Sequence, residues 1–367
     1  MVSGKQLVST LEADGRLIVE LREETLPEPK GHEVLIRVEA APINPSDLAL
    51  LFGPADLDNA DYAPGRIVAP MPERAVRAMQ GRLGQAMPVG NEGAGTVIAA
   101  GEVAQGLIGK RVAAVAGGMY AQYRIVDARA CLVLPEGASA EQGAAAFVNP
   151  LTALSFVEAM RREGHKALVH TAAASNLGQM LARICKAEGI PLVNVVRSEA
   201  QVALLRGQGA EHVVNSSAPD FEVDLQDAIA ATGATLGFDA VGGGKLAGQI
   251  LHAMEQVASR GAAYSRYGSN VFKKVYIYGA LDMGPTIVNR TFGFGWAIAG
   301  FLLTPFLQSI GEEAAERLRQ RVRDELTTTF ASSYKARVTL EQALTREAAL
   351  AFNARATGSK YLIVPHG

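Results

Sequence analysis

Small residues fill the connection between an apolar run and an amphipathic run at residues 169–189, VHTAAASNLGQMLARICKAEG. A turn of this kind leaves the first backbone N–H groups of a helix unpaired, and with the helix dipole they favour a phosphate. Small side chains let a diphosphate approach the backbone, and a glycine lets helix and strand pack closely. An ordinary tight turn is the alternative, because only one of the usual three glycines is present. The residues expected to hold a dinucleotide are Ala174, Ser175, Asn176, Leu177 and Gly178.

The end of the next apolar run, PLVNVVRS, indicates which nucleotide this would be. An acidic residue normally stands there when a ribose 2′-hydroxyl is bound, whereas this chain has Arg197 and Ser198. A guanidinium can engage a phosphate through charge-assisted, bidentate hydrogen bonds. We therefore expect NADPH rather than NADH. The alternative is an arginine that is merely exposed, and Glu199 beside it weighs toward that alternative.

The elements that must position these residues follow from the pattern after residue 166. Short apolar runs alternate with amphipathic runs of about ten to fifteen residues, which predicts strands joined by crossover helices. Such an alternation favours an α/β fold with a doubly wound parallel sheet. The predicted strands are KALVHTA, PLVNVVR, EHVVN, TLGFDAVGG and KKVYIYGA.

The first 150 residues have a different character, with short alternating runs separated by glycines, as in HEVLIRVEAAPI at 32–43. This predicts mostly β structure. The period becomes helical at 138–164, where Ser139 and Gln142 form a candidate capping box. A charged helix is expected after Gly311, and SKYLIVP at 359–365 is expected to return as a strand to the first domain.

Composition excludes several classes of partner. The 367 residues carry 35 basic and 37 acidic side chains, so no overall field favours nucleic acid or an anionic membrane. Two isolated cysteines, Cys131 and Cys185, and no recognisable signal peptide predict a cytoplasmic location. The apolar stretch 293–307 falls short of the ~20 residues that span a bilayer, and is expected to be buried or at an interface.

Seven segments in this order resemble the medium-chain dehydrogenase/reductase superfamily, in its zinc-free quinone oxidoreductase and 2-enoyl thioester reductase branch. The resemblance implies a mostly β GroES-like domain over 1–150, completed by about 311–367, with a Rossmann NADP-binding domain over 151–310. It also implies a homodimer, for which the apolar strand around Trp296–Leu303 could pair edge to edge. The matching segments are EVLIRVEAAPINPSD, PVGNEGAGTVIAAG, GKRVAAV, VNPLTA, the small-residue turn, FDAVGGG and GSKYLIV.

No metal site is expected. The zinc-dependent members of the superfamily have a cysteine where Asn44 stands and a histidine where Asn91 stands, and this chain lacks the four clustered cysteines of their structural zinc lobe. The six histidines are scattered singly. His170 lies beside the small-residue turn, but a single histidine at a strand end is more often only hydrogen-bonded.

The resemblance also implies roles for individual residues. Asn44 corresponds to a residue beside the nicotinamide and the substrate carbonyl, and Tyr62 is the only tyrosine in the loop where the enoyl reductases carry one that assists the reaction. These two are the catalytic candidates, although Tyr62 could equally pin its loop. Further cofactor contacts are expected from Thr152, Val241, Gly242, Tyr278, Gly279 and Lys360.

The expected activity is therefore hydride transfer from NADPH to a small electrophilic substrate, without zinc. An enone or enoyl thioester suits this chemistry, as does a quinone, because the developing oxyanion needs hydrogen-bond donors and a proton source. A strict quinone reductase and a non-catalytic NADPH-binding protein are the alternatives. The helix expected at 72–83 is either a lid, with Arg74 and Arg77 toward the phosphates of a coenzyme A thioester, or a surface helix docked by its apolar stripe.

Overall fold

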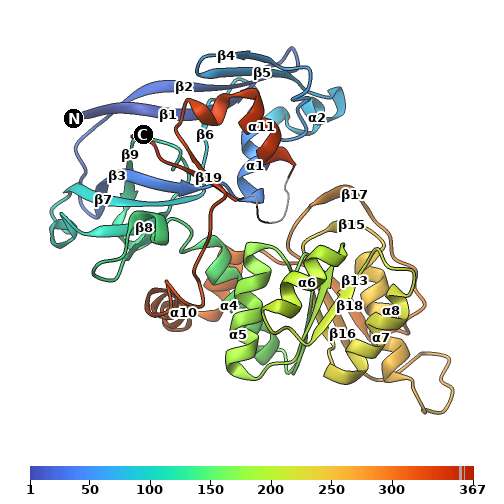
Figure 1. The fold of residues 1–367 in the computed structure, drawn as a ribbon. Coiled ribbons are helices and arrows are strands. Elements are labelled where there is room, and N and C mark those ends of the chain that lie inside the picture. Colours follow the sequence, from blue (N-terminus) through green and yellow to red (C-terminus); the bar gives the residue numbers. More distant parts are fainter. Residues whose placement is uncertain (355–357, 359) are drawn as a thin grey trace. The chain divides into compact units, whose positions relative to one another are not determined.

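The computed structural model describes residues 1–354, 358 and 360–367. The chain divides into two compact units (Figure 1). Unit 1 comprises Met1–Val148 and Arg319–Gly367, and unit 2 comprises Asn149–Leu318. The second unit is therefore inserted into the first along the sequence.

Unit 2 is built on a parallel sheet of six strands in the order β13-β12-β11-β14-β16-β18. The strand order reverses between β11 and β14, which lie side by side, so this is the point where an open α/β sheet forms a ligand crevice at its carboxyl edge. The five strands predicted from the sequence are all present, and the apolar stretch before residue 301 adds the sixth. The strands are β11 (Leu168–His170), β12 (Leu192–Val196), β13 (His212–Asn215), β14 (Leu236–Asp239), β16 (Lys273–Ile277) and β18 (Trp296–Gly300).

Helices cover both faces of this sheet (Figure 1). The apolar sides of α7 and α8 pack with the strands in one core cluster, whereas α6 contributes to a separate cluster with β12 and β13. Leu181, Ile184 and Cys185, predicted on one face of α5, are all buried. The helices of this part of the chain are α4 (Val148–Arg162), α5 (Asn176–Glu188), α6 (Glu199–Gly207), α7 (Phe221–Thr232), α8 (Leu246–Ala258), α9 (Leu303–Ile310) and α10 (Glu312–Asp324).

A small parallel ribbon of β15 (Gly242–Gly244) and β17 (Asp282–Thr286), which the sequence pattern did not predict, follows the carboxyl ends of β14 and β16. It begins at Gly242, which has a φ of +80°. A Cβ at this position would lie 2.7 Å from the carbonyl oxygen of Gly279, so only glycine fits there without strain.

Unit 1 is mostly β structure, with two sheets around one apolar core. One sheet has the order β4-β5-β2-β1-β6, and the other has the order β10-β8-β7-β3-β20-β19, with β9 also paired to β3. The strands are β1 (Val2–Leu11), β2 (Arg16–Leu26), β3 (Glu33–Pro42), β4 (Asp61–Ala63), β5 (Arg66–Pro70), β6 (Met87–Pro88), β7 (Glu92–Ala100), β8 (Arg111–Val115), β9 (Tyr123–Asp127), β10 (Cys131–Val133), β19 (Ala336–Val338) and β20 (Tyr361–Ile363).

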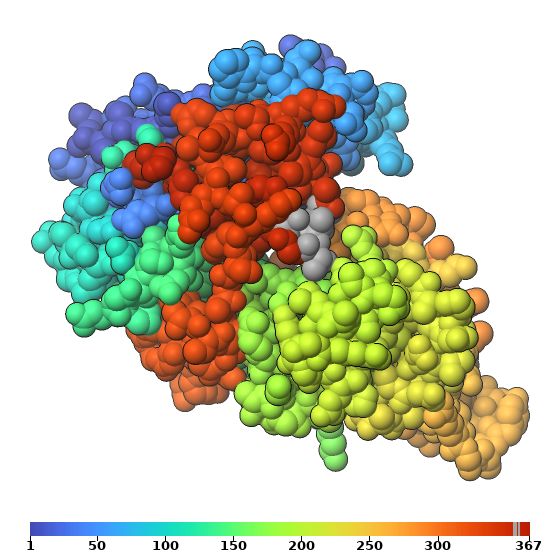
Figure 2. Space-filling view, viewed as in Figure 1, coloured from blue at the N-terminus to red at the C-terminus, as the bar shows by residue number. Residues whose placement is uncertain are grey.

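The C-terminal segment completes unit 1, as the sequence predicted. Strand β20 pairs antiparallel with β3, with Leu362 opposite Pro42, and parallel with β19. Figure 2 accordingly shows residues from the end of the chain, in red, lying against those from its beginning, in blue. The short helices of this unit are α1 (Pro45–Leu51), α2 (Glu73–Ala78), α3 (Ala140–Gly143) and α11 (Arg346–Asn353).

The insertion at 51–90 forms ordered structure within unit 1. Its hairpin of β4 and β5 extends the first sheet, and α2 follows. The helix expected over 72–83 is shorter, because it ends at Ala78 and continues as a single 3₁₀ turn. Its predicted apolar stripe, Val76, Met79 and Leu83, packs against the core of unit 1. Arg77 pairs with Glu73 one turn earlier on the exposed face.

Candidate functional site

The turn between β11 and α5 has the features of a phosphate cradle. Ala172 adopts a φ of +49°, a conformation that no other non-glycine residue of the described chain shares. Ser175 caps α5 by accepting a hydrogen bond from the amide of Gly178 at 3.1 Å. A Cβ on Gly178 would lie 2.2 Å from the carbonyl oxygen of Ala173, so this glycine brings the helix and strand together.

Two amides in this turn remain available to a ligand. Within the described residues, the backbone N–H groups of Ala174 and Leu177 have no protein acceptor. Because unpaired amides at a helix N-terminus are the usual partners of a phosphate, the turn fits the diphosphate of a dinucleotide.

Arg197 lies directly after β12 and is exposed. Its backbone is held by Gln201 and Ser217, whereas no residue in the described part of the chain forms a hydrogen bond or ion pair with its guanidinium. Glu199, the nearby carboxylate, instead accepts a hydrogen bond from the side chain of Asn215 at 2.6 Å. Ser198 caps α6. The guanidinium of Arg197 is therefore free to bind an anion.

A buried pair that sequence reasoning missed organises the carboxyl edge of the sheet. Thr171 and Asp239 are both buried, and the hydroxyl of Thr171 donates to Oδ1 of Asp239 at 2.7 Å. The same carboxylate accepts the amides of Val241 and Gly242, two of the predicted cofactor contacts. The acidic residue within the apolar segment FDAVGGG was the available signal, because a buried carboxylate needs donors.

His170 is fully buried, and its Nε2 lies 2.8 Å from the hydroxyl of Tyr278. Burial lowers the pKa of His170 to about 3, so the ring is neutral at physiological pH. The two rings also stack, with centroids 5.8 Å apart. This agrees with the expectation that His170 is hydrogen-bonded within the protein, and its partner is the hydroxyl of Tyr278.

The structure places Thr152 on α4, where its side chain is buried. This residue belongs to unit 2, as do the turn residues, Arg197, Gly242 and Tyr278, so all of these predicted contacts occur on one domain. Asn44, Tyr62 and Lys360 belong to unit 1.

Asn44 is buried next to two carboxylates that the sequence analysis did not identify. Its side-chain Nδ2 donates to Oε1 of Glu92 at 2.8 Å, and its backbone N donates to Oδ2 of Asp47 at 2.8 Å. The other oxygen of Glu92 accepts the backbone amides of Phe147 and Val148, each at 2.9 Å. The side-chain oxygen of Asn44 is buried without a partner in the described chain. Asn44 is also the N-cap of α1, where its side chain faces the backbone of Asp47 in a capping box.

Lys360 balances part of this buried charge. Its Nζ is buried with no hydrogen-bond partner among the described residues, and the ring centroid of Tyr334 lies 5.8 Å away. Burial lowers the pKa of Lys360 to about 8, although Glu92 and Asp47 oppose the shift. Burial likewise raises the pKa of Asp47 to about 6. The ammonium and the two carboxylates therefore form one electrostatic cluster, and the orphaned Nζ could bind an anionic or carbonyl group.

Tyr62 lies on β4, half-buried against the core of unit 1. Its hydroxyl donates to the carbonyl oxygen of Leu57 at 2.7 Å, which ties down the preceding loop. Its assignment as a proton donor stays a prediction, and reaction would require this hydrogen bond to be exchanged.

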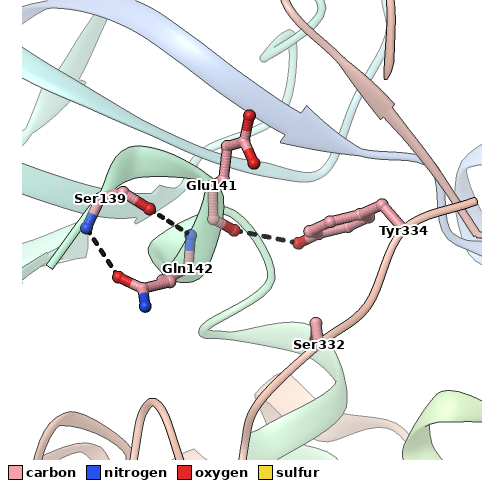
Figure 3. A pocket seen from close by; sticks show the side chains of 5 residues that line it. All are labelled: Ser139, Glu141, Gln142, Ser332 and Tyr334. Atoms are coloured by element: carbon pink, nitrogen blue, oxygen red, sulfur yellow. Dashed lines mark hydrogen bonds between the residues drawn. The ribbon is translucent and has the colours of Figure 1, made fainter. Parts of the chain in front are cut away.

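A hollow of about 350 Å³ elsewhere on unit 1 involves none of the predicted site residues. Figure 3 shows its lining, in which Ser139 and Gln142 form the predicted capping box. In the same view Tyr334 donates to the carbonyl oxygen of Glu141 at 3.3 Å. The side chains of Ser139, Gln142 and Tyr334 therefore already form hydrogen bonds within the protein.

Within the described residues, no group of three His, Cys, Asp or Glu side chains is arranged to hold a metal ion. Cys131 and Cys185 are unpaired, and burial raises the pKa of each thiol to about 12.

Comparison with known proteins agrees with this architecture. Residues 30–136 match the alcohol dehydrogenase GroES-like domain. The human mitochondrial enoyl-[acyl-carrier-protein] reductase is 27% identical over 220 residues, covering 57% of this chain and 52% of that protein. A quinone oxidoreductase of Pseudomonas aeruginosa is 32% identical over 133 residues, covering 35% of this chain and 41% of that protein. The chain thus spans about half the length or less of these curated relatives.

Among solved structures, a provisionally named NADPH:quinone reductase of Mesorhizobium loti has a TM-score of 0.75 and 29% identity, covering 99% of this chain and 98% of that one. The Escherichia coli quinone oxidoreductase has a TM-score of 0.70 and 19% identity, covering 99% and 100% respectively. Together with the fold, these matches show that residues 30–136 form an alcohol dehydrogenase GroES-like domain and that the chain is similar to quinone oxidoreductases and enoyl reductases.

Proposed function

We propose that the protein is an NADPH-dependent oxidoreductase that transfers hydride to an activated C=C bond or to a quinone. The free guanidinium of Arg197 at the end of β12 is the observation that favours NADPH over NADH, because it can bind a 2′-phosphate that NADH lacks. The turn at Ser175–Gly178 would hold the diphosphate. In support, the similar E. coli quinone oxidoreductase was solved with NADPH, and another similar structure contains NADP and crotonyl-CoA.

The nucleotide supplies the hydride, and the protein supplies orientation and electrostatic stabilisation. Reduction of an enone or enoyl thioester places negative charge on the carbonyl oxygen, which a nearby cation or hydrogen-bond donor stabilises. In unit 1 the buried ammonium of Lys360 is a cation and a hydrogen-bond donor, and it is therefore suited to stabilise this negative charge. Tyr62 is proposed as a proton source, provided its bond to Leu57 opens.

The reaction is tested by following NADPH oxidation with three acceptors offered separately, a short enoyl thioester, an enone and a quinone. Turnover of the thioester or enone assigns reduction of C=C bonds, and turnover of the quinone alone assigns a strict quinone reductase. Tight NADPH binding without turnover of any acceptor would contradict an enzymatic role and favour an NADPH-binding protein without catalysis.

A homodimer is also proposed, through the outer edge of β18. This strand is the last in its sheet, and its apolar residues Trp296 and Ile298 are only half-buried. An apolar strand with one unpaired edge is well suited to pairing with a second copy. Sedimentation should give twice the mass of the chain, and Ile298→Lys should shift it to the monomer. A monomeric wild-type protein would contradict this part of the proposal.

A further inference from the structure

Arg124 is a cation without a counter-ion in unit 1. It lies on β9, opposite Ile36 of β3, and its side chain is half-buried. Its Nε atom is buried and has no hydrogen-bond partner among the described residues. The rest of the guanidinium likewise forms no hydrogen bond or ion pair with that part of the chain. Because a charged group that is partly withdrawn from water normally has a partner, this guanidinium is available to an anion.

Gly118 lies against the same guanidinium and provides a second unpaired donor. It is buried, with a φ of +67°, and a Cβ at this position would lie 2.9 Å from Cζ of Arg124. Only glycine therefore lets the guanidinium lie so close to the backbone. The carbonyl oxygen of Gly118 accepts a hydrogen bond from Gln6 at 3.4 Å, whereas its N–H has no acceptor within the described chain. Buried backbone N–H groups without a partner are rare in proteins.

These two groups, called the donor pair below, cannot satisfy each other. A guanidinium and a backbone N–H both have only hydrogens to donate. They need an acceptor that can lie against both, and the positive charge of Arg124 favours an anionic oxygen. A phosphate combines negative charge with several acceptor oxygens, and guanidinium groups bind it through charge-assisted hydrogen bonds. The donor pair therefore has the chemistry of a phosphate site.

The loop that contains Gly118 is connected to the candidate catalytic residue of the same unit. The amide of Gly117 donates to the carbonyl oxygen of Asn91 at 3.3 Å, and the amide of Asn91 donates to Oδ1 of Asp47 at 2.8 Å. The other oxygen of Asp47 accepts the backbone N–H of Asn44. All of these residues belong to unit 1, as does the guanidinium. A continuous chain of hydrogen bonds thus joins this loop to Asn44.

We propose that Arg124 and the amide of Gly118 bind the phosphate of a phosphopantetheine thioester. This inference rests on the proposed function and narrows its substrate to thioesters. The phosphates of the nucleotide are assigned to Ser175–Gly178 and Arg197 of unit 2, so a phosphate on unit 1 belongs to the second substrate. A simple enone or quinone has no phosphate. The phosphopantetheine arm, which coenzyme A and acyl carrier proteins share, has one.

The binding site is tested by calorimetric titration with phosphopantetheine and with pantetheine, which differ only in the phosphate. Wild type should bind phosphopantetheine about tenfold or more tightly than pantetheine. Arg124→Gln should abolish this difference while leaving the affinity for pantetheine unchanged. Equal affinity of wild type for the two compounds, or a difference that survives in Arg124→Gln, would overturn the inference.

The matched control is Arg129→Gln, at an exposed arginine of the same unit whose guanidinium already pairs with Asp127. This variant should keep the full preference for phosphopantetheine. Coenzyme A and dephospho-coenzyme A identify which phosphate is bound, because only the first carries the 3′-phosphate. If coenzyme A binds more tightly than dephospho-coenzyme A and phosphopantetheine binds no better than pantetheine, the assignment to the pantetheine phosphate is wrong.

Should Arg124→Gln not fold, the wild-type protein gives an independent test. The KM for the crotonyl thioester of phosphopantetheine should be about tenfold or more below that for the crotonyl thioester of pantetheine, with a similar kcat. Turnover of both thioesters with equal KM overturns only the phosphate site. Preferential binding of phosphopantetheine without turnover of any acceptor leaves the phosphate site in place and contradicts the proposed function.

Discussion

The hydroxyl of Thr171 donates to Asp239 at 2.7 Å and accepts the amide of Ala240 at 2.8 Å, joining the carboxyl ends of β11 and β14. These two strands flank the point where the strand order reverses. A single side-chain pair therefore connects the loop that is proposed to bind the diphosphate with the loop that begins the β15–β17 ribbon. The shape of the crevice edge depends on this pair.

Thr171→Val keeps the shape of the side chain but removes its hydroxyl. The amide of Ala240 and one oxygen of Asp239 then lose a partner, so we expect a loss of about 1–3 kcal/mol in the free energy of unfolding. NADPH binding should weaken as well, because the turn after β11 is less well held. Urea denaturation and nucleotide titration measure the two effects. Thr232→Val is the control, since that hydroxyl only bonds back to its own helix, and equal losses in both variants would contradict the account.

The buried ion pair of Lys273 and Glu255 fixes the loop between α8 and β16. Nζ lies 2.5 Å from Oε2, and Glu255 also accepts the amide and hydroxyl of Ser269. Lys273→Met leaves a buried carboxylate unpaired, which should cost about 3–5 kcal/mol of unfolding free energy. Lys274→Met, which breaks a more exposed pair with Glu163, should cost about 1 kcal/mol or less. Similar costs measured by chemical denaturation would argue against a structural role for Lys273.

Glu255 should also make the protein sensitive to acid. Burial alone would raise its pKa, but the hydrogen bonds from Lys273 and Ser269 together outweigh burial and lower the pKa to about 2. The folded-state pKa lies below the ordinary value of 4.5, so the stabilisation is complete above that value and is lost as pH falls toward 2. Glu255→Gln should flatten the fall in unfolding free energy over this range. A slope unchanged by the substitution would contradict this assignment.

The lowered pKa of Lys360 predicts that the free energy of unfolding depends on pH in the alkaline range. Burial lowers its pKa from 10.5 to about 8, so between these values the unfolded chain binds a proton that the folded protein does not. The free energy of unfolding contributed by this residue therefore rises as pH increases from about 8 to 10.5. Lys360→Met should remove that rise, whereas Lys166→Met, at an exposed lysine, should leave it in place. Chemical denaturation of both variants at pH 8 and pH 10 tests this prediction. An equal rise in the free energy of unfolding in both variants would contradict it.

Local patterns predicted the parts of the fold that depend on short-range order. The alternation of apolar strands and amphipathic helices predicted the parallel sheet. The small-residue turn, which joins β11 to α5, lies where the strand order reverses. The capping box of Ser139 and Gln142 was also confirmed. Each of these features depends on residues close together in the sequence.

The pairings that the sequence did not reveal join residues far apart in the chain. Asn44 and Glu92 are 48 positions apart, and Thr171 and Asp239 are 68 apart. An acidic residue within an apolar, glycine-rich segment, as in GNEGAG, was the only local sign of such a partner. Lys273 is a further case, because it is fully buried against Glu255, 18 positions earlier in the chain.

The central claim, that this chain selects NADPH through Arg197, is tested most directly by comparing dissociation constants for NADPH and NADH. Wild type should bind NADPH more tightly, and Arg197→Ala should lose about tenfold or more for NADPH while its affinity for NADH hardly changes. Arg206→Ala, at the far end of the same helix, should leave both constants unchanged. Equal affinity of the wild type for the two nucleotides, or no binding of either, would contradict the account.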